Sequence, residues 1–303
     1  MKNRIGYIFV AITTLIWGIN PTMFKSLSGF ASPNVQNFFR MLMASIFLYI
    51  YAKCFEEKKK EIKVHSIKDY ILPGVVCYAF AQFYIFGISL SKANIASFIM
   101  SGLGPVITII ILALFIKEER KHTKDFWVKT SIVIGFIGAV LVMLNFSGGI
   151  QYGLDFGAFM VLLGAIFWAI YTMLIRKYFS DVSPIIFCRN IIIMNCLFFF
   201  VTIIFTGELF QLGNLTLLQI GLLLLAGIIA DAFANITFFL GITKVSAIKA
   251  NVIFLLAPII SLVVARITLN ESLTLQQFIG CMLTLLASIL LTANEFRKRF
   301  KTQ

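Results

Sequence analysis

Long apolar stretches alternate with short polar ones along the whole chain, and this alternation predicts a membrane-spanning protein. A helix of about 20 apolar residues crosses a hydrocarbon core of about 30 Å. The stretches lack the two-residue alternation of barrel strands, so a membrane-spanning barrel is excluded. The pattern predicts an all-α membrane protein with ten spans, at residues 5–25, 33–53, 70–91, 94–116, 126–146, 154–175, 185–206, 217–241, 247–268 and 275–295.

Basic residues gather in every second connection between these spans. Most of the 26 lysines and arginines lie in the two termini and in the even-numbered connections, whereas the odd-numbered connections contain only Lys25 and Lys92. Basic residues stay on the cytoplasmic side of a membrane. We therefore expect both termini to be cytoplasmic, and we expect the protein in the plasma membrane, which is the inner membrane of a bacterium.

Composition agrees with this interpretation and narrows the chemistry. Hydrophobic residues make up 60% of the 303 residues and charged residues 13%, with a mean hydropathy of +0.95. The net charge of +13 comes mainly from basic residues in the connections between the spans, where such residues set the orientation in the membrane. We therefore expect no nucleic-acid partner. Five scattered cysteines without a C-x-x-C pair indicate neither a metal site nor a disulfide framework, and no phosphate-binding glycine loop occurs. The expected partners are membrane lipid and a small-molecule substrate, without a cofactor.

The second half of the chain repeats the first in a weak but ordered way. We interpret residues 1–151 and 152–303 as two repeats of five helices each. Because five is odd, the second repeat enters the membrane in the opposite direction, and inverted repeats are typical of secondary transporters. At a shift of 151 to 153 residues the matches are Gly6 with Gly157, Trp17 with Trp168, Ser32-Pro33 with Ser183-Pro184, and Pro105 and Glu118 with Pro258 and Glu271.

Several of these positions resemble a known family. The motifs are Trp17-Gly18, the Ser-Pro pair before Arg40, the stretch S-x-x-x-S-G-L-G-P-V at 97–106, and N-V-I-F-L-L-A-P-I at 251–259. They resemble the EamA family of the drug/metabolite transporter superfamily. The resemblance implies ten helices in two five-helix repeats, a central cavity lined by helices 1 to 4 and 6 to 9, and diverse substrates. The second half departs from this family pattern at two positions. Ala169 stands where a glycine is expected, and Arg189 is two places out of register with Arg40.

Asp231 is the only acid well inside an apolar span. A buried carboxylate is costly in a membrane, so it is expected to face a cavity or a partner. It has two interpretations, a counter-charge or proton carrier for transport, or a structural acid bonded to a neighbouring helix. Asn235 lies one turn further along. In the repeat alignment Tyr78 and Gln82 stand opposite these two residues, so we expect all four near the midplane, together with the two proline breaks.

Arg40 lies about eight residues into the second span. Three roles are open to it. It can receive a substrate carboxylate through its two-pronged guanidinium, extend to the headgroups, or pair with a neighbouring helix.

Two prolines are expected to interrupt the fourth and ninth spans. Pro105, preceded by Gly102 and Gly104, and Pro258 each lack the backbone N–H that a helix requires. Broken backbone at membrane depth is tolerated where it lines a cavity. The alternative is a packing kink without substrate contact.

Four further residues are candidates for the cavity wall. Trp17 and Trp168 lie too deep for the interfacial belt of aromatic residues. They are stacking surfaces for a substrate or part of the bundle core. Asn20, which precedes Pro21, and its repeat counterpart Tyr171 are added to the binding candidates.

Other polar and small residues favour structural roles. Glu118 and Glu271 are expected to cap the next helix or to pair with basic residues, and Thr274 with Gln277 predicts a capping box. Small residues at four-residue spacing predict close helix contacts and suggest a homodimer interface. They are Ser131, Gly135 and Ala139 in the fifth span and Gly280, Thr284 and Ser288 in the tenth.

These observations predict a secondary transporter that moves a small polar metabolite by alternating access. With Arg40 for a carboxylate and Asp231 for an amine, the first hypothesis is an amino acid or a related zwitterion, with proton coupling through Asp231 as a compatible one. The alternatives are an exporter of drugs or toxic compounds and, more remotely, a membrane-embedded enzyme or a receptor. A single deep acid without a deep histidine argues against the enzyme.

Overall fold

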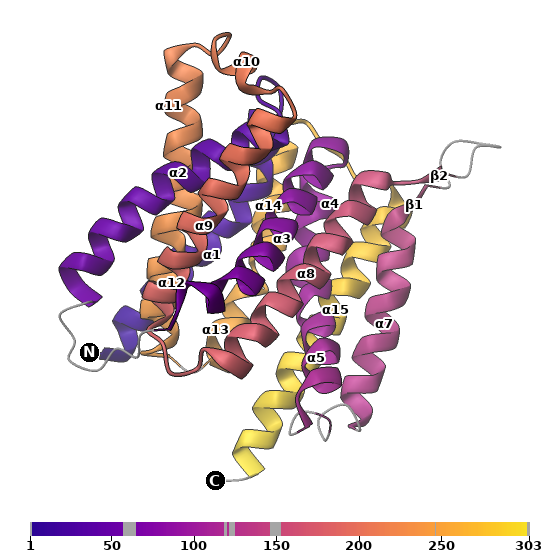
Figure 1. Cartoon of the computed structure of the whole chain (residues 1–303). Coiled ribbons are helices and arrows are strands. Elements are labelled where there is room, and N and C mark those ends of the chain that lie inside the picture. The colour runs from indigo at the N-terminus through magenta and orange to yellow at the C-terminus, as the bar shows by residue number, and fades with distance from the viewer. Residues whose placement is uncertain are drawn as a thin grey trace.

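The first half of the chain is made of helices that belong to one bundle with those of the second half (Figure 1). The computed structural model describes residues 2–56, 65–117, 120, 125–145, 153–245 and 247–301. The elements of the first half are α1 (Lys2–Leu27), α2 (Pro33–Tyr51), the π-helical η1 (Ala52–Glu56), the 3-10 turn η2 (Ile67–Tyr70), α3 (Ile71–Leu90), α4 (Ala93–Ser97), the π-helical η3 (Phe98–Leu103), α5 (Gly104–Phe115) and α7 (Phe126–Met143).

The second half packs its helices among those of the first (Figure 1). It is preceded by a two-residue antiparallel pair of strands, in which Leu144 faces Leu154. The elements are β1 (Leu144–Asn145), β2 (Gly153–Leu154), α8 (Phe156–Tyr178), α9 (Pro184–Phe205), α10 (Leu209–Leu212), α11 (Leu217–Ala226), the π-helical η5 (Gly227–Phe233), α12 (Ala234–Ile242), α13 (Ala247–Phe254), α14 (Ala257–Thr268) and α15 (Leu275–Lys301).

The helices have the dimensions of membrane spans. Within the described residues, nine helical segments are long and apolar enough to cross a membrane. The predicted span at 247–268 is divided into α13 and α14. Its apolar part, Val252–Thr268, is shorter than the nine spanning segments. Apart from the short strand pair, the described chain is helical, and it is a multi-pass membrane protein. The count of ten spans stays a prediction.

Side-chain caps begin several helices. The Ser32 hydroxyl accepts a hydrogen bond from the Val35 backbone N–H at the start of α2. Thr274 and Gln277 exchange two side-chain to backbone bonds of 3.2 Å each, so the predicted capping box is confirmed. Glu271 caps a helix in the other half of the chain, where the carboxylate accepts bonds from the backbone N–H groups that begin α4.

The expectation for Glu271 was therefore wrong about which helix it caps. Its oxygens lie 2.9 Å from Ala93 N and 3.3 Å from Asn94 N, because the connection after α14 passes over the start of α4. A carboxylate at a helix N-terminus satisfies free N–H groups and complements the helix dipole. Glu118, its counterpart, lies outside the described residues.

The small-residue faces of α7 and α15 pack against each other inside one chain. A Cβ added at Gly138 would lie 2.8 Å from the Gly280 carbonyl oxygen, and one at Gly280 would lie 2.8 Å from the Gly138 carbonyl oxygen. The predicted close helix contact is confirmed, and it is intramolecular. Ser131, Thr284 and Ser288 are at most 1% exposed, so this face is not accessible to a second copy, and a homodimer stays a prediction without an assigned surface.

Candidate functional site

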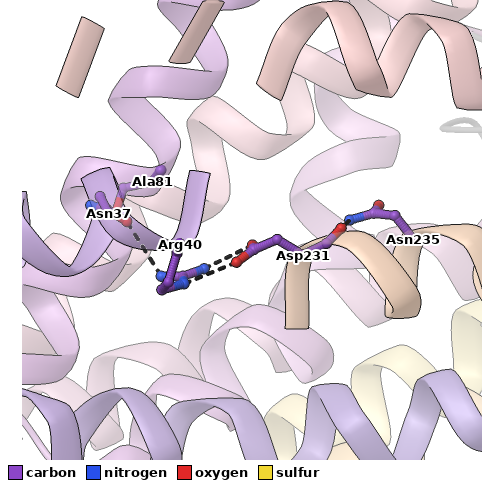
Figure 2. A network of polar contacts seen from close by, with 5 residues as sticks. All are labelled: Asn37, Arg40, Ala81, Asp231 and Asn235. Atoms are coloured by element: carbon purple, nitrogen blue, oxygen red, sulfur yellow. Dashed lines mark hydrogen bonds and ion pairs between the residues drawn. The ribbon is translucent and has the colours of Figure 1, made fainter. Parts of the chain in front are cut away.

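Arg40 of α2 and Asp231 of η5 form an ion pair inside the helix bundle. Arg40 Nε donates to Asp231 Oδ2 at 2.9 Å, and Arg40 Nη2 donates to Oδ1 at 2.8 Å, as Figure 2 shows. The two side chains are 5% and 15% exposed. This two-pronged geometry is the strongest form of an arginine and carboxylate contact. Of the three roles open to Arg40 in the sequence, the structure has it paired with a neighbouring helix.

Close backbone packing brings the two charged residues together. A Cβ at Gly227 would clash with the Arg40 carbonyl oxygen and lie 2.8 Å from the Arg40 Cα. Only a glycine permits this approach of η5 to α2. The approach coincides with a π-helical stretch, Gly227–Phe233, that contains Asp231. Such wide turns often occur at functional sites.

Besides Asp231, two neighbours hold the arginine. Its Nη1 donates to Asn37 Oδ1 at 3.3 Å, and Asn37 Nδ2 donates to the Ala81 carbonyl of α3 at 3.3 Å (Figure 2). The guanidinium carbon lies 3.7 Å from the centroid of the Phe24 ring of α1, a cation–π contact. Arg40 therefore joins α1, α2 and η5, with α3 reached through Asn37.

The other members of the predicted polar group make different contacts. Asn235 Nδ2 donates to the Asp231 backbone carbonyl at 2.6 Å, so it shares the site through the main chain (Figure 2). Tyr78 bonds to Thr202 of α9, with the oxygens 2.8 Å apart, and Gln82 donates to Asn34 of α2 at 2.6 Å. Within the described residues, neither is hydrogen-bonded to Asp231 or Asn235.

The tryptophans occupy aromatic clusters. Trp17 stacks on Phe254 at a centroid distance of 5.5 Å and contacts Phe238 at 5.1 Å. Trp168 contacts Phe80 at 4.9 Å and Tyr171 at 5.5 Å. Both tryptophans are partly buried, and their assignment to a substrate stays a prediction.

The two remaining wall candidates, Asn20 and Tyr171, are almost completely buried. They are 8% and 7% exposed, respectively. Their assignment to a substrate stays a prediction.

The two proline positions differ, because the helix is continuous through Pro105 and is broken before Pro258. Before Pro105 the helix widens into η3, and α5 begins at Gly104. Before Pro258 α13 ends at Phe254, and α14 begins at Ala257. At Gly102 an added Cβ would lie 2.9 Å from Thr284 Oγ1 of α15, which gives this glycine a packing role.

A separate groove of about 530 Å³ lies between the end of α14 and the start of α15. Arg266 and Glu271 are among its lining residues, and Arg40 and Asp231 are not. Most of its wall is apolar, and the polar centre of the bundle is elsewhere.

Three comparisons with known proteins show what this chain is similar to. The EamA-like transporter family matches the chain twice, over residues 4–144 and 155–293. The chain belongs to this family. The two matched segments meet at the ion pair, because Arg40 lies in the first and Asp231 in the second.

Relatives of this EamA-like protein carry the name of uncharacterized transporters. One from Clostridium kluyveri is 25% identical over 302 residues, covering 94% of this chain and 92% of its own length. One from Archaeoglobus fulgidus is 25% identical and one from Bacillus subtilis 22%, each covering more than nine tenths of both chains. A solved crystal structure of a protein shares the fold, with a TM-score of 0.64, 14% identity and 98% coverage of both chains.

The residues that complete the site had weaker signals in the sequence. Asn37 lies three positions before Arg40, a spacing that places both on one helix face. Glu208 lies between two spans, where an acid has no special meaning by itself. In the structure its carboxylate accepts bonds from Ser32 and Asn34 at the start of α2.

Proposed function

We propose that this EamA-like protein is a secondary transporter that moves a small zwitterion, with an amino acid as the first candidate, across the plasma membrane by alternating access. The observation that carries the proposal is the buried, two-pronged pair of Arg40 and Asp231 between the two matched segments. Buried ion pairs are poor stabilisers compared with apolar packing, so a charge pair at this depth favours a functional role.

The pair provides both halves of zwitterion recognition. The guanidinium fork of Arg40 suits a substrate carboxylate, and Asp231 suits a substrate ammonium group. A zwitterion can replace the internal pair with two external ones, so neither charge is left alone in the membrane. A substrate with only one of the two groups leaves Arg40 or Asp231 unpaired, which is costly.

Packing symmetry supports an inverted repeat. Gly6 of α1 packs against Lys244 and Val245 just beyond α12, and its counterpart Gly157 of α8 packs against Ser91 at the end of α3. The contact between α1 and α12 thus has a counterpart between α8 and α3. Inverted repeats move against each other around a central site in many transporters.

The charge pattern supports the orientation. If lysines and arginines mark the cytoplasm, the beginning of α2 and the connection after α9 face outward. The beginning of α1 and the end of α15 lie toward the same end of the molecule in Figure 1, in keeping with two cytoplasmic termini.

Transport of purified protein in proteoliposomes tests the proposal. We expect counterflow of a zwitterionic amino acid, and we expect it to be lost in Arg40→Lys, which keeps the charge but not the fork. A matched panel of the amino acid, its methyl ester and its N-acetyl derivative separates the two contacts. Equal transport of all three compounds would contradict zwitterion recognition. It would favour the alternative function, export of drugs or toxic compounds.

Proton coupling through Asp231 is a compatible second hypothesis. Protonation of the carboxyl group would remove the partner charge of Arg40. We expect a pH gradient to drive uptake in the parent protein and to have no effect in Asp231→Asn. pH-dependent transport that persists in this variant would remove both roles of Asp231.

A further inference from the structure

A stripe of polar side chains runs along α2 from its first turn to the ion pair. Asn34, Asn37 and Arg40 follow at three-residue spacing, which places them on one helix face. They are 8%, 0% and 4% exposed, and the stripe covers about 9 Å of helix length. Buried polar side chains are costly unless they have hydrogen-bond partners, so three in a row on one helix face need an explanation.

Glu208 closes the stripe at the end where α2 begins. Its Oε2 accepts from Ser32 Oγ at 2.5 Å, and its Oε1 accepts from Asn34 Nδ2 at 2.9 Å. The same connection supplies Gln211, whose Oε1 accepts from the Ser32 backbone N–H at 3.3 Å. In Figure 1 the connection that contains α10 lies at the end of the molecule where α2 begins. A connection of the second half of the chain thus covers the end of the polar stripe, and we call this end the mouth of the stripe.

Several hydrogen-bond acceptor oxygens lie at this end of the stripe, beside the donors that they bind. Glu208 offers two carboxylate oxygens, and Gln82 Oε1 is buried and has no partner among the described residues. The amide of Gln82 is held in place by its bond to Asn34 Oδ1. An ammonium group has three N–H donors and no acceptor, so it complements this set.

We propose that Glu208, Asn34 and Gln82 form an entry site that binds the amine of the substrate before its carboxylate reaches Arg40. This inference rests on the proposed function and adds a site to it. When the amine takes the carboxylate of Glu208, the bonds to Ser32 and Asn34 are released, and the stripe along α2 opens to the outside. Glu208 is then both the first contact and the closing element of the path.

A contact at the opposite end of the molecule gives a matched control. Glu56 of η1 precedes Glu208 by 152 residues and accepts a bond from Ser183 Oγ, the residue before α9, at 2.8 Å. It therefore repeats the bond of Glu208 to Ser32. Residues 34 and 37 have apolar counterparts on α9, Ile185 and Cys188, so no polar path begins there.

Cysteine labelling from outside tests the entry site. Asn37→Cys places a thiol on the stripe, and native Cys188 is its counterpart on α9. A membrane-impermeant cationic thiosulfonate is added to sealed right-side-out vesicles, and the label is located by peptide mass spectrometry. We expect slow labelling at position 37 that rises about tenfold with Glu208→Ala and less with Glu208→Gln, because loss of one charge-assisted bond is enough for such a change.

Three controls give the test its contrast. Glu56→Ala is expected not to raise labelling at position 37 from outside, and Cys188 is expected to stay unlabelled in every case. With Glu208 intact, the cationic reagent is expected to react faster than an anionic one of equal reactivity, and Glu208→Gln is expected to reduce that ratio. Equal labelling with and without Glu208, or no preference for the cation, would overturn the entry site.

Transport measured in the same vesicles separates this inference from the function on which it rests. If zwitterions are transported but labelling at position 37 does not depend on Glu208, the entry site is contradicted and the proposed transport function stands. Glu208-dependent labelling without flux of any zwitterion contradicts the proposed substrate and retains the path.

Discussion

Helices α2 and α9 pack against each other and begin alike, but they present different faces to the centre of the bundle. Each starts with a serine and a proline, and each serine bonds to a glutamate of the other half. Beyond this start, α2 carries Asn34, Asn37 and Arg40, whereas the matching positions of α9 are apolar.

The two halves match the same family, but their corresponding helices differ in polarity. Ile185 and Ile191 of α9 lie in a cluster with aromatic side chains, and Cys188 packs in another apolar cluster. A fold of two matching segments therefore does not require two matching sites. In this protein the charged centre belongs to the interface of α2 with η5, and the interface of α9 with α3 is mainly a packing surface.

The largest expected effect comes from breaking the ion pair. Asp231→Ala leaves Arg40 charged and buried, and we expect about 3–5 kcal/mol of lost stability with complete loss of transport. The double variant Arg40→Ile, Asp231→Tyr installs the residues that α9 and α3 carry at the matching positions, Ile191 and Tyr78. Chemical denaturation in detergent is expected to show that this double variant is more stable than Asp231→Ala. Transport assays are expected to show that it is still inactive.

The opposite result would change the comparison. A double variant that transports would mean that the charged pair is a structural element of α2. A double variant less stable than the single ones would mean that the α2 interface cannot accept the packing of the α9 interface.

The next effect is expected at two matched glycines. Gly227 packs against the backbone of Arg40, and Gly74, its counterpart at a shift of 153, packs against the side chain of Met194 on α9. We expect Gly227→Ala to cost about 1–3 kcal/mol, because backbone cannot yield to a new methyl group. Gly74→Ala is expected to be nearly neutral, because the flexible end of a methionine can move.

A third glycine is the control for helix propensity. A Cβ at Gly221 of α11 would meet nothing within 4 Å. Gly221→Ala is therefore expected to be neutral or to stabilise by up to about 1 kcal/mol. Thermal unfolding of the three variants measures the series, and equal losses at Gly227 and Gly74 would mean that the two interfaces are equally rigid.

Hydropathy predicted the nine helices that are long enough to cross a membrane within the described residues, and Arg40 and Asp231 stood out by their charge, but their pairing was not predicted. Hydropathy predicts the spans because the membrane sets their length. Arg40 and Asp231 each stand out in an apolar window, yet their contact depends on the rotation of α2 against η5. The π-helical turns around Asp231 change that rotation, and no residue pattern in the sequence predicts these turns.

The unknown rotation of the helices also explains why the contacts of other polar residues were not predicted. Repeat alignment put Tyr78 and Gln82 level with Asp231 and Asn235, and level residues on different helices can still face away from one another. Glu208 is separated from Ser32 by 176 residues, so only the folded chain brings them together.

The smallest expected effect tests the role of Tyr78 in the α9 interface. Its hydroxyl bonds to Thr202, which also donates to the Phe198 carbonyl at 2.9 Å, so Thr202 keeps a partner when the tyrosine oxygen is removed. Tyr78→Phe is expected to cost about 0.5–1.5 kcal/mol and to leave the KM for substrate unchanged. Thr202→Val is expected to cost a similar amount, and the double variant is expected to cost less than the sum, since the two share one bond. A raised KM in Tyr78→Phe without such coupling would instead place Tyr78 at the substrate and return the α9 side to the transport chemistry.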